Sequence, residues 1–278
     1  MIIFPKAKIN LGLNVVERRP DGYHNLETVF LEVPLSDALE VQPMDPSFPS
    51  DVDCDLQVTG IPVEGDVQRN LVVRAYQQLK ADFPSLARVH VHLYKRIPTQ
   101  AGMGGGSSDA AAMLRLLNTL FGLKLSTDEL IRRAALLGAD CPFFILGGAA
   151  YGEGIGERLQ PVGIDFSGWS LAVVRPAIPI PTREAFALVR PMRPQKNVLD
   201  IVRQPVESWR GQLVNDFERS VFAQHPEIAD VRDRLYELGA TYSAMSGSGS
   251  AVYGFFRQPV DLSLATIFPD MYTALLPL

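Results

Sequence analysis

The stretch between Pro98 and Ala112 has the residue types and spacing of a phosphate-binding loop. It reads P-T-Q-A-G-M-G-G-G-S-S-D-A-A-A, with four glycines within five positions and two serines directly after them. Glycine allows positive φ and a close approach of the backbone to a ligand, because it has no Cβ. Where such a turn opens into a helix, unpaired N–H groups and the positive end of the helix dipole attract an anion. We therefore predict a phosphate site here.

The flanking residues favour this hypothesis over a flexible loop. Apolar residues alternate at Val89, Val91 and Leu93, which predicts a strand over 89–95, and the residues from about Ser108 to Phe121 suit a helix. Strand, glycine turn and helix are the context that such a site requires.

Several familiar sites are excluded by their missing motifs. The sequence has no Gly-Lys-Ser/Thr, no complete Gly-x-Gly-x-x-Gly, no Gly-x-Ser-x-Gly, no His-Glu-x-x-His and no protein-kinase signature. The glycine run is therefore neither a Walker loop nor a dinucleotide-binding turn.

Composition indicates an ordinary soluble protein of two domains. The chain has 278 residues, of which 47% are hydrophobic and 21% charged, and single cores rarely grow beyond about 250–300 residues. We place the domain boundary near Asp165–Trp169, giving domains of residues 1–165 and 166–278.

Charge and cysteine content narrow the partners and the compartment. A net charge of −5 argues against nucleic acid or an anionic membrane as partner. No apolar run approaches the ~18 residues that span a bilayer, so we expect a cytoplasmic protein. Cys54 and Cys141 are expected to be reduced thiols. We expect a monomer or a weak homodimer that acts on small molecules.

The first residues read as a strand with a cationic face. Period-two geometry places Lys6, Lys8 and Asn10 on one face and apolar residues on the other. Such a face is either a solvated sheet edge, where lysines discourage aggregation, or part of a site.

Asp140 stands out among the acids of the chain. A helix with a capping box at Ser126-x-x-Glu129 is expected to stop at Gly138, and an almost entirely apolar run follows Asp140. A carboxylate is costly to bury there unless it is paired. It either caps a short turn or has a chemical role.

Two further segments could recognise a ligand. Asp21-Gly22 forms a turn, and Tyr23 and His24 after it make either a structural cluster or a flat recognition surface. Ser246 to Ser250 is a second turn of small residues next to a strand.

Together these segments resemble the GHMP kinase superfamily, named for galactokinase, homoserine kinase, mevalonate kinase and phosphomevalonate kinase. Its first motif resembles Ala7-Lys8-Ile9-Asn10-Leu11, its second Gly102 to Ala111 and its third Ser246 to Ser250. Asp21 to His24 and Leu137 to Pro142 resemble members that phosphorylate an alcohol bearing cytidine diphosphate.

The resemblance spans Ala7 to about Phe255 and implies a fold and an activity. The fold is a two-domain α/β (α+β) GHMP kinase fold, with an N-terminal ribosomal protein S5 domain 2-like part, a C-terminal ferredoxin-like part and the active site in the cleft between. The activity is transfer of the γ-phosphoryl group of ATP to an alcohol, with Mg²⁺.

The resemblance also implies roles for single residues. Asp140 is the base and Lys8 its cationic partner, and Ser108 is the candidate Mg²⁺ ligand. The ATP-binding residues are Asn70, Lys95, Gly102, Met103, Gly104, Gly105, Gly106, Ser107 and Ser108. The substrate-binding residues are Asn10, Tyr23, His24, Thr182 and Phe186, with Tyr23 and Phe186 sandwiching the cytosine and His24 reading its polar edge.

Two departures from the family pattern concern the binding loops. Lys6 stands where proline is usual, which adds a second cation beside Lys8, and Gln100 stands where a small residue is usual. The alternatives are another small-molecule kinase, such as a homoserine or mevalonate kinase, and a nucleotide-binding regulator without catalysis. Phe186 with Tyr23 and His24 favours a cytidine-bearing substrate over the first alternative, and retention of both Lys8 and Asp140 disfavours the second.

Overall fold

The computed structural model describes residues 1–257 and 263–278 and divides into two compact units. Unit 1 comprises Met1–Ala7, Leu35–Thr99 and Gly104–Gly147; unit 2 comprises Lys8–Pro34, Gln100–Met103 and Gly148–Leu278. These units interleave along the chain, whereas the predicted domains are continuous, and a boundary after residue 165 stays a prediction. No helix in the described part of the chain is long and apolar enough to cross a bilayer.

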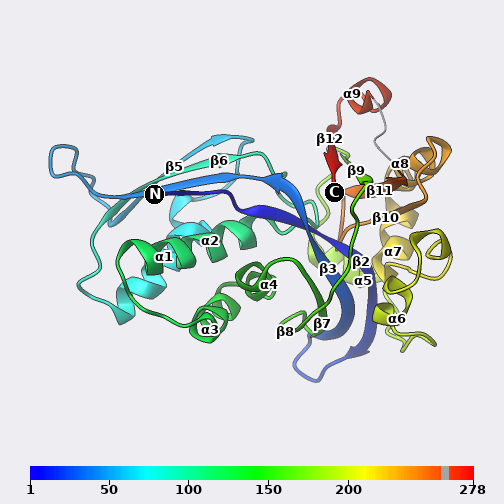
Figure 1. Ribbon diagram of the computed structural model, residues 1–278, viewed down its shortest axis with the longest axis horizontal. Helices are drawn as coiled ribbons and strands as arrows, with labels where there is room; N and C mark the ends of the chain where they lie inside the picture. The colour runs from blue at the N-terminus through cyan, green and yellow to red at the C-terminus, as the bar shows by residue number, and fades with distance from the viewer. Residues whose placement is uncertain (258–262) are drawn as a thin grey trace. The chain divides into compact units, whose positions relative to one another are not determined.

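Unit 1 is a four-stranded sheet in the order β1-β4-β6-β5, with helices on one face (Figure 1). The strands β5 and β6 are parallel and are joined through α1, while the other neighbours are antiparallel. The strands are β1 (Ile2–Ile3), β4 (Ala38–Pro43), β5 (Cys54–Gly60) and β6 (Val89–Lys95). The helices are η1 (Val67–Arg69), α1 (Leu71–Asp82), α2 (Gly105–Leu120), α3 (Thr127–Leu137) and α4 (Cys141–Leu146).

Local sequence signals account for most of unit 1. The predicted strand 89–95 is confirmed as β6, and its alternating apolar residues are buried. Asn70 precedes α1 and its Oδ1 accepts a hydrogen bond from the Val72 N–H at 2.9 Å. The capping box of Ser126 and Glu129 is formed at α3, which ends before Gly138 as predicted.

The start of α2 corrects the prediction. The helix begins at Gly105 rather than near Ser108, after Gly104 with φ +69°. A Cβ on Gly105 would approach Ile97 Cγ2 to 2.9 Å, so only glycine fits at this contact. Glycine is a poor helix former, but here packing determines both the residue and the helix start.

Unit 2 contains two four-stranded sheets, β2-β3-β7-β8 and β10-β11-β9-β12. In the first, β7 is antiparallel to both β3 and β8, and all pairs of the second are antiparallel. If the strands of the second sheet are numbered 1 to 4 in chain order (β9, β10, β11, β12), their spatial order is 4-1-3-2. Helices follow the first and the third of these strands, which is a ferredoxin-like arrangement. The strands are β2 (Lys6–Arg18), β3 (His24–Ser36), β7 (Ala149–Gly154), β8 (Arg158–Pro161), β9 (Trp169–Arg175), β10 (Tyr242–Met245), β11 (Val252–Arg257) and β12 (Tyr272–Pro277).

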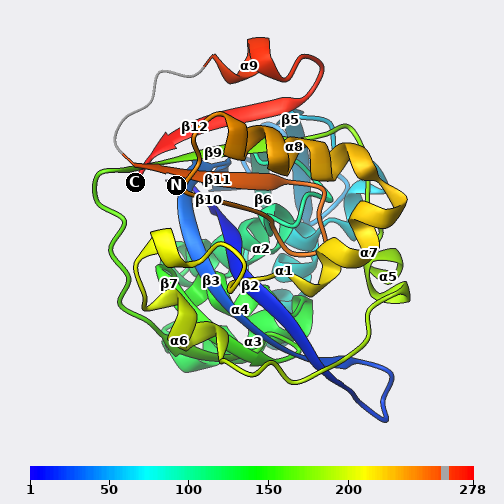
Figure 2. The same ribbon diagram turned by 90° about the vertical axis from the view of Figure 1, so that its right-hand side faces the viewer.

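Among the helices of unit 2, the long helix that begins at Pro226 packs against β10 and β11 of the ferredoxin-like sheet (Figure 2). The helices of unit 2 are α5 (Thr182–Ala187), α6 (Val198–Val202), η2 (Val206–Ser208), α7 (Asp216–Gln224), α8 (Pro226–Glu237) and α9 (Leu264–Ile267). The helix from Pro226 has an apolar face, because Ile228, Val231 and Leu235 are buried in one cluster with strand residues such as Val252. Helix α5 begins at Thr182, and Pro181 occupies its N-cap position.

Candidate active site

Lys8 is a buried cation in unit 2. Only 3% of the residue is exposed. Its Nζ donates to Asn10 Oδ1 at 2.6 Å and to the Gly102 carbonyl at 2.9 Å, and it lies 5.3 Å from the centroid of the Phe30 ring. The interpretation of this face as a solvated sheet edge is therefore wrong for Lys8 and Asn10, because the side chains are held inside the protein.

Asn10 links the first and third predicted motifs. Its Nδ2 donates to Thr28 Oγ1 at 3.0 Å, and its N–H donates to Ser246 Oγ at 3.3 Å. Its carbonyl accepts a hydrogen bond from the Tyr253 hydroxyl at 2.8 Å. Both the side chain and the backbone of Asn10 are thus fixed, which orients the amide oxygen toward Lys8.

The first part of the glycine loop belongs to this same network. Gly102 has φ +71°, and a Cβ added to it would overlap the Ser246 carbonyl. Ser246 Oγ donates to the Gly102 carbonyl at 2.9 Å, and the Lys8 N–H donates to the Met103 carbonyl at 3.0 Å. The Gly102 carbonyl therefore accepts hydrogen bonds from both Lys8 and Ser246.

The second part of the glycine loop opens α2 in unit 1. Gly104, Gly105 and Gly106 lie at the N-terminus of a helix without a side-chain cap, so backbone N–H groups there suit an anion. Ser108 is buried, and its N–H donates to the Gly104 carbonyl at 2.9 Å. Ser107 is half-buried and its side chain hydrogen-bonds Cys141.

A cavity of about 730 Å³ in unit 1 brings together three predicted ATP-binding residues. Asn70, Lys95 and Gly106 line it, together with Thr99 and Asp109. Cavities of roughly 300–1,000 Å³ are typical of small-molecule sites, so this volume is adequate for a nucleoside.

Lys95 takes part in a buried ion triad. Its Nζ contacts Asp37 Oδ2 and lies 2.7 Å from Asp109 Oδ2. Burial by itself lowers the pKa of Lys95, but the carboxylates of Asp109 and Asp37 outweigh it, so that pKa is raised. Burial raises the pKa of Asp109 to about 7, although Lys95 opposes the rise.

Asp109 belongs to the candidate site but was not among the residues predicted from the sequence. It is buried, lines the cavity, and its Oδ1 has no hydrogen-bond partner among the described residues. A signal was present, because Asp109 falls in helical register with Ala112, Met113 and Leu116. An acid within an apolar helix face needs a buried partner, which Lys95 provides.

Asp140 does not use its side chain to cap the helix that follows it. It occupies the N-cap position of α4 with φ −82° and ψ −16°, but no side-chain cap hydrogen bond forms. The residue is half-buried, and α4 after it is buried from Cys141 to Ile145. The interpretation of Asp140 as only a turn cap is therefore not supported.

Two of the predicted cytidine-binding residues in unit 2 lie against each other. His24 stacks on Phe186, with ring centroids 4.6 Å apart and planes at 20°. Burial and the nearby Arg18 lower the pKa of His24, which favours a neutral imidazole. Phe186 also packs edge-on against Phe217 at 4.7 Å.

Tyr23 and Thr182 are more open. Tyr23 is 61% exposed, and its N–H donates to Asp21 Oδ1 at 3.1 Å. Thr182 is exposed at the start of α5. A sandwich of cytosine between Tyr23 and Phe186 stays a prediction.

No group of three or more histidine, cysteine or acidic residues suited to a metal occurs in the described ranges, 1–257 and 263–278. Mg²⁺ in kinases is bound mainly by substrate phosphates and water, with one or two protein ligands. The hydroxyls of Ser107 and Ser108 at the start of α2 fit that limited need, and Ser107 is the less buried of the two.

Known proteins resemble this chain over nearly its whole length. Residues 70–148 match the family described as GHMP kinases N terminal domain, and residues 196–265 match GHMP kinases C terminal. The 4-diphosphocytidyl-2-C-methyl-D-erythritol kinase of Parabacteroides distasonis is 46% identical over 272 residues, which cover 98% of this chain and 97% of the relative. The enzyme of the same name from Bacteroides fragilis is 49% identical over 256 residues, 92% of each chain.

A solved structure supports the same grouping. The crystal structure of a 4-(cytidine 5'-diphospho)-2C-methyl-D-erythritol kinase superposes with a TM-score of 0.80 at 35% identity, covering 100% of this chain and 99% of that one. The chain thus belongs to the GHMP kinase family and groups with its 4-diphosphocytidyl-2-C-methyl-D-erythritol kinases.

Proposed function

We propose that this protein transfers the γ-phosphoryl group of ATP to the 2-hydroxyl of 4-diphosphocytidyl-2-C-methyl-D-erythritol, in the non-mevalonate route to isoprenoids. The observation that carries the proposal is the buried Lys8 ammonium, which Asn10 and the Gly102 carbonyl hold in place. Relatives of that name at 46% and 49% identity support the choice of substrate.

In the proposed reaction Asp140 removes the proton of the 2-hydroxyl. The hydroxyl oxygen forms a bond to the γ-phosphorus, the bond from that phosphorus to the β,γ-bridging oxygen breaks, and ADP leaves with the electron pair. Lys8 stabilises the negative charge that develops on the attacking oxygen. Phosphoryl transfer depends mostly on positioning and charge stabilisation, so a fixed lysine suits this role.

The nucleotide is proposed to bind through the cavity and the glycine loop. Asn70 and Lys95 line the cavity proposed for adenosine, and the residues from Gly102 to Ser108 surround the phosphates, with the N–H groups that precede Ser108 as donors. Mg²⁺, when bound, neutralises charge on the phosphates, and Ser107 or Ser108 would hold it.

The cytidine is proposed to stack on Phe186. Base stacking on one aromatic side chain contributes about 1–3 kcal/mol in comparable sites. The neutral His24 imidazole would offer one donor and one acceptor to the polar edge of cytosine, with Tyr23 and Thr182 nearby and Asn10 orienting the alcohol.

The remaining expectations are that the protein is cytoplasmic, a monomer or weak homodimer, and without a nucleic-acid or membrane partner. Its net charge of −5 supports the last of these. The domain boundary after residue 165 falls between the two matched family segments, 70–148 and 196–265, which supports it.

The direct test is an assay of ADP formation from ATP with three alcohols offered separately. We expect turnover with 4-diphosphocytidyl-2-C-methyl-D-erythritol and almost none with homoserine or mevalonate. Faster turnover of homoserine or mevalonate would assign the protein to another branch of the family.

A further inference from the structure

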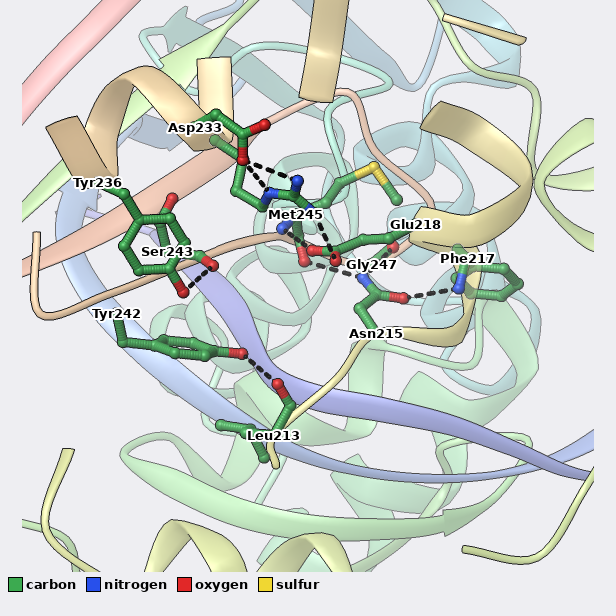
Figure 3. Close-up of polar contacts among 11 residues, drawn as sticks. Leu213, Asn215, Phe217, Glu218, Asp233, Tyr236, Tyr242, Ser243, Met245 and Gly247 are labelled. Atoms are coloured by element: carbon green, nitrogen blue, oxygen red, sulfur yellow. Dashed lines mark hydrogen bonds and ion pairs between the residues drawn. The ribbon is translucent and has the colours of Figure 1, made fainter. Parts of the chain in front are cut away.

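Asn215 directs its amide at the loop of the third motif (Figure 3). The residue is 3% exposed. Its Nδ2 donates to the Met245 carbonyl at 2.8 Å and to the Gly247 carbonyl at 2.9 Å. These two carbonyls flank Ser246, so one amide group fixes the backbone on both sides of that serine.

The backbone N–H of Met245 also binds a side chain of α7. Its N–H donates to Glu218 Oε1 at 2.7 Å, so both polar backbone groups of Met245 bond to side chains at or near the N-terminus of α7. The segment before α7 is hydrogen-bonded to β2. The Leu13 N–H donates to the Val214 carbonyl at 2.9 Å, and Leu13 and Asn215 form an isolated parallel β-bridge.

The fixed loop leads directly to the buried lysine. Ser246 Oγ donates to the Gly102 carbonyl at 2.9 Å, and the same carbonyl accepts a hydrogen bond from Lys8 Nζ at 2.9 Å. All of these groups belong to unit 2. A shift of the Ser246 backbone would therefore move the oxygen that positions Lys8.

We infer that Asn215 is a positioning residue for phosphoryl transfer, which holds the third motif so that Gly102 and Lys8 keep their geometry. The inference rests on the proposed role of Lys8. Catalysis is sensitive to such displacements, since a misplacement of about 1 Å can cost roughly 100-fold in rate.

The alternative is that Asn215 only caps α7. Its Oδ1 does accept a hydrogen bond from the Phe217 N–H at 3.0 Å. Asn197 offers a matched control: its Oδ1 caps α6 through the Leu199 N–H at 2.7 Å, but its Nδ2 contacts Tyr151 Oη at 3.0 Å and Glu27 Oε2 at 3.4 Å.

Serine variants separate the two roles, because serine is as good an N-cap as asparagine but cannot reach two carbonyls. In Asn215→Ser we expect kcat to fall by about tenfold or more, with both Michaelis constants within about threefold of wild type. Asn197→Ser is expected to keep kcat within about twofold. Circular dichroism establishes that each variant is folded at the assay temperature.

A double-mutant cycle tests the path through Ser246. If Asn215 acts through the loop, Asn215→Ser has a much smaller effect on kcat in a Ser246→Ala background than in wild type. Asn197→Ser is expected to have the same small effect in both backgrounds.

An aspartate variant provides a second measurement if Asn215→Ser does not fold. Asn215→Asp keeps the shape and the cap, but its ionised carboxylate repels both carbonyls, whereas its protonated form donates to one. Its kcat relative to wild type is expected to decline as pH rises from about 6 to about 8. The carboxyls of Glu218 and Asp216 lie nearby, and a new carboxylate at position 215 raises their pKa values, so their titration contributes to the same decline. Asn197→Asp is expected to show no such decline.

Equal kcat in the two serine variants, additive effects in the cycle, or a pH-independent ratio for Asn215→Asp would each overturn the inference. Failure of the proposed function can be distinguished from failure of the inference on Asn215, because Lys8→Met would keep its turnover only if the proposed function is wrong. If Lys8→Met is inactive while Asn215→Ser matches its control, only the role of Asn215 fails.

Discussion

Two loops rich in glycine and serine are held in different ways. The loop from Gly102 to Ser108 continues into α2, so its second half is fixed by helical backbone hydrogen bonds. The loop from Ser246 to Ser250 lies between two strands, and side chains from the start of α7 hold its N-terminal end.

The difference shows that two loops of similar composition can have different structural roles. The first loop presents N–H groups at a helix start, which is a property of the local sequence. The second loop presents a serine to Gly102, and its position depends on residues that are about thirty positions away in the chain, such as Asn215 with a sequence separation of 30 from Met245.

Gly102→Ala is expected to have the largest effect on stability. The new Cβ would overlap the Ser246 carbonyl at a residue whose φ is +71°, so we expect a loss of at least about 2 kcal/mol in the free energy of unfolding by urea. Gly106→Ala is the control, because its Cβ would meet only Leu71 Cδ1 at 3.8 Å. Equal stability of the two variants would mean that the contact between the loops is not close.

Glu218→Gln tests the hydrogen bond between Glu218 and the second loop through the pH dependence of stability. Burial raises the pKa of Glu218 from 4.5 to about 7, although the Met245 N–H and Arg232 oppose the rise. Between these two values the folded protein keeps a proton that the unfolded chain releases, so wild-type stability falls as pH rises through this window.

The glutamine variant lacks this loss and can still accept a hydrogen bond from Met245. Its stability relative to wild type should therefore increase between pH 4.5 and about 7, by on the order of 2 kcal/mol. Thermal unfolding of both proteins across that range measures the change. A constant difference would show that Glu218 titrates normally.

Phe186→Ala tests the proposed cytidine site independently of the two loops. We expect the Michaelis constant for the cytidine substrate to rise about tenfold, because one stacking face is lost, while that for ATP stays within about twofold. Phe222→Ala is the control, since Phe222 packs against the same core as Phe186. Equal changes for both substrates would mean that Phe186 does not stack on cytosine.

Gln100→Gly is expected to have the smallest effect. Gln100 is exposed and has φ +51°, a conformation that costs a residue with a side chain roughly 1 kcal/mol. Because glycine also gains freedom in the unfolded chain, we expect a net stabilisation below about 1 kcal/mol, with urea unfolding as the measurement. A destabilised variant would indicate that the glutamine side chain contributes contacts of its own.

Local signals in the sequence predicted much of the fold and part of the site. The strand 89–95 and the Ser126 capping box depend on neighbouring residues, and both predictions are confirmed. The start of α2 was wrong because the fit of Gly105 against Ile97 is a tertiary contact.

The side-chain hydrogen bonds that fix the second loop could not be predicted either, because they are also tertiary contacts. Asn215-Asp216-Phe217-Glu218 indicates a helix N-terminus and nothing more, since the partners of the two outer side chains lie at Met245 and Gly247. The triad of Lys95, Asp37 and Asp109 likewise joins three distant segments.

The most direct test of the proposed mechanism is the turnover of Asp140→Asn with 4-diphosphocytidyl-2-C-methyl-D-erythritol and ATP. Asp128→Asn, which changes an exposed acid of the same unit, is the control. We expect kcat of Asp140→Asn to fall at least ~100-fold, the scale of losing a general base, with unchanged ATP affinity. Turnover close to that of Asp128→Asn would contradict the role of Asp140 and with it the proposed mechanism.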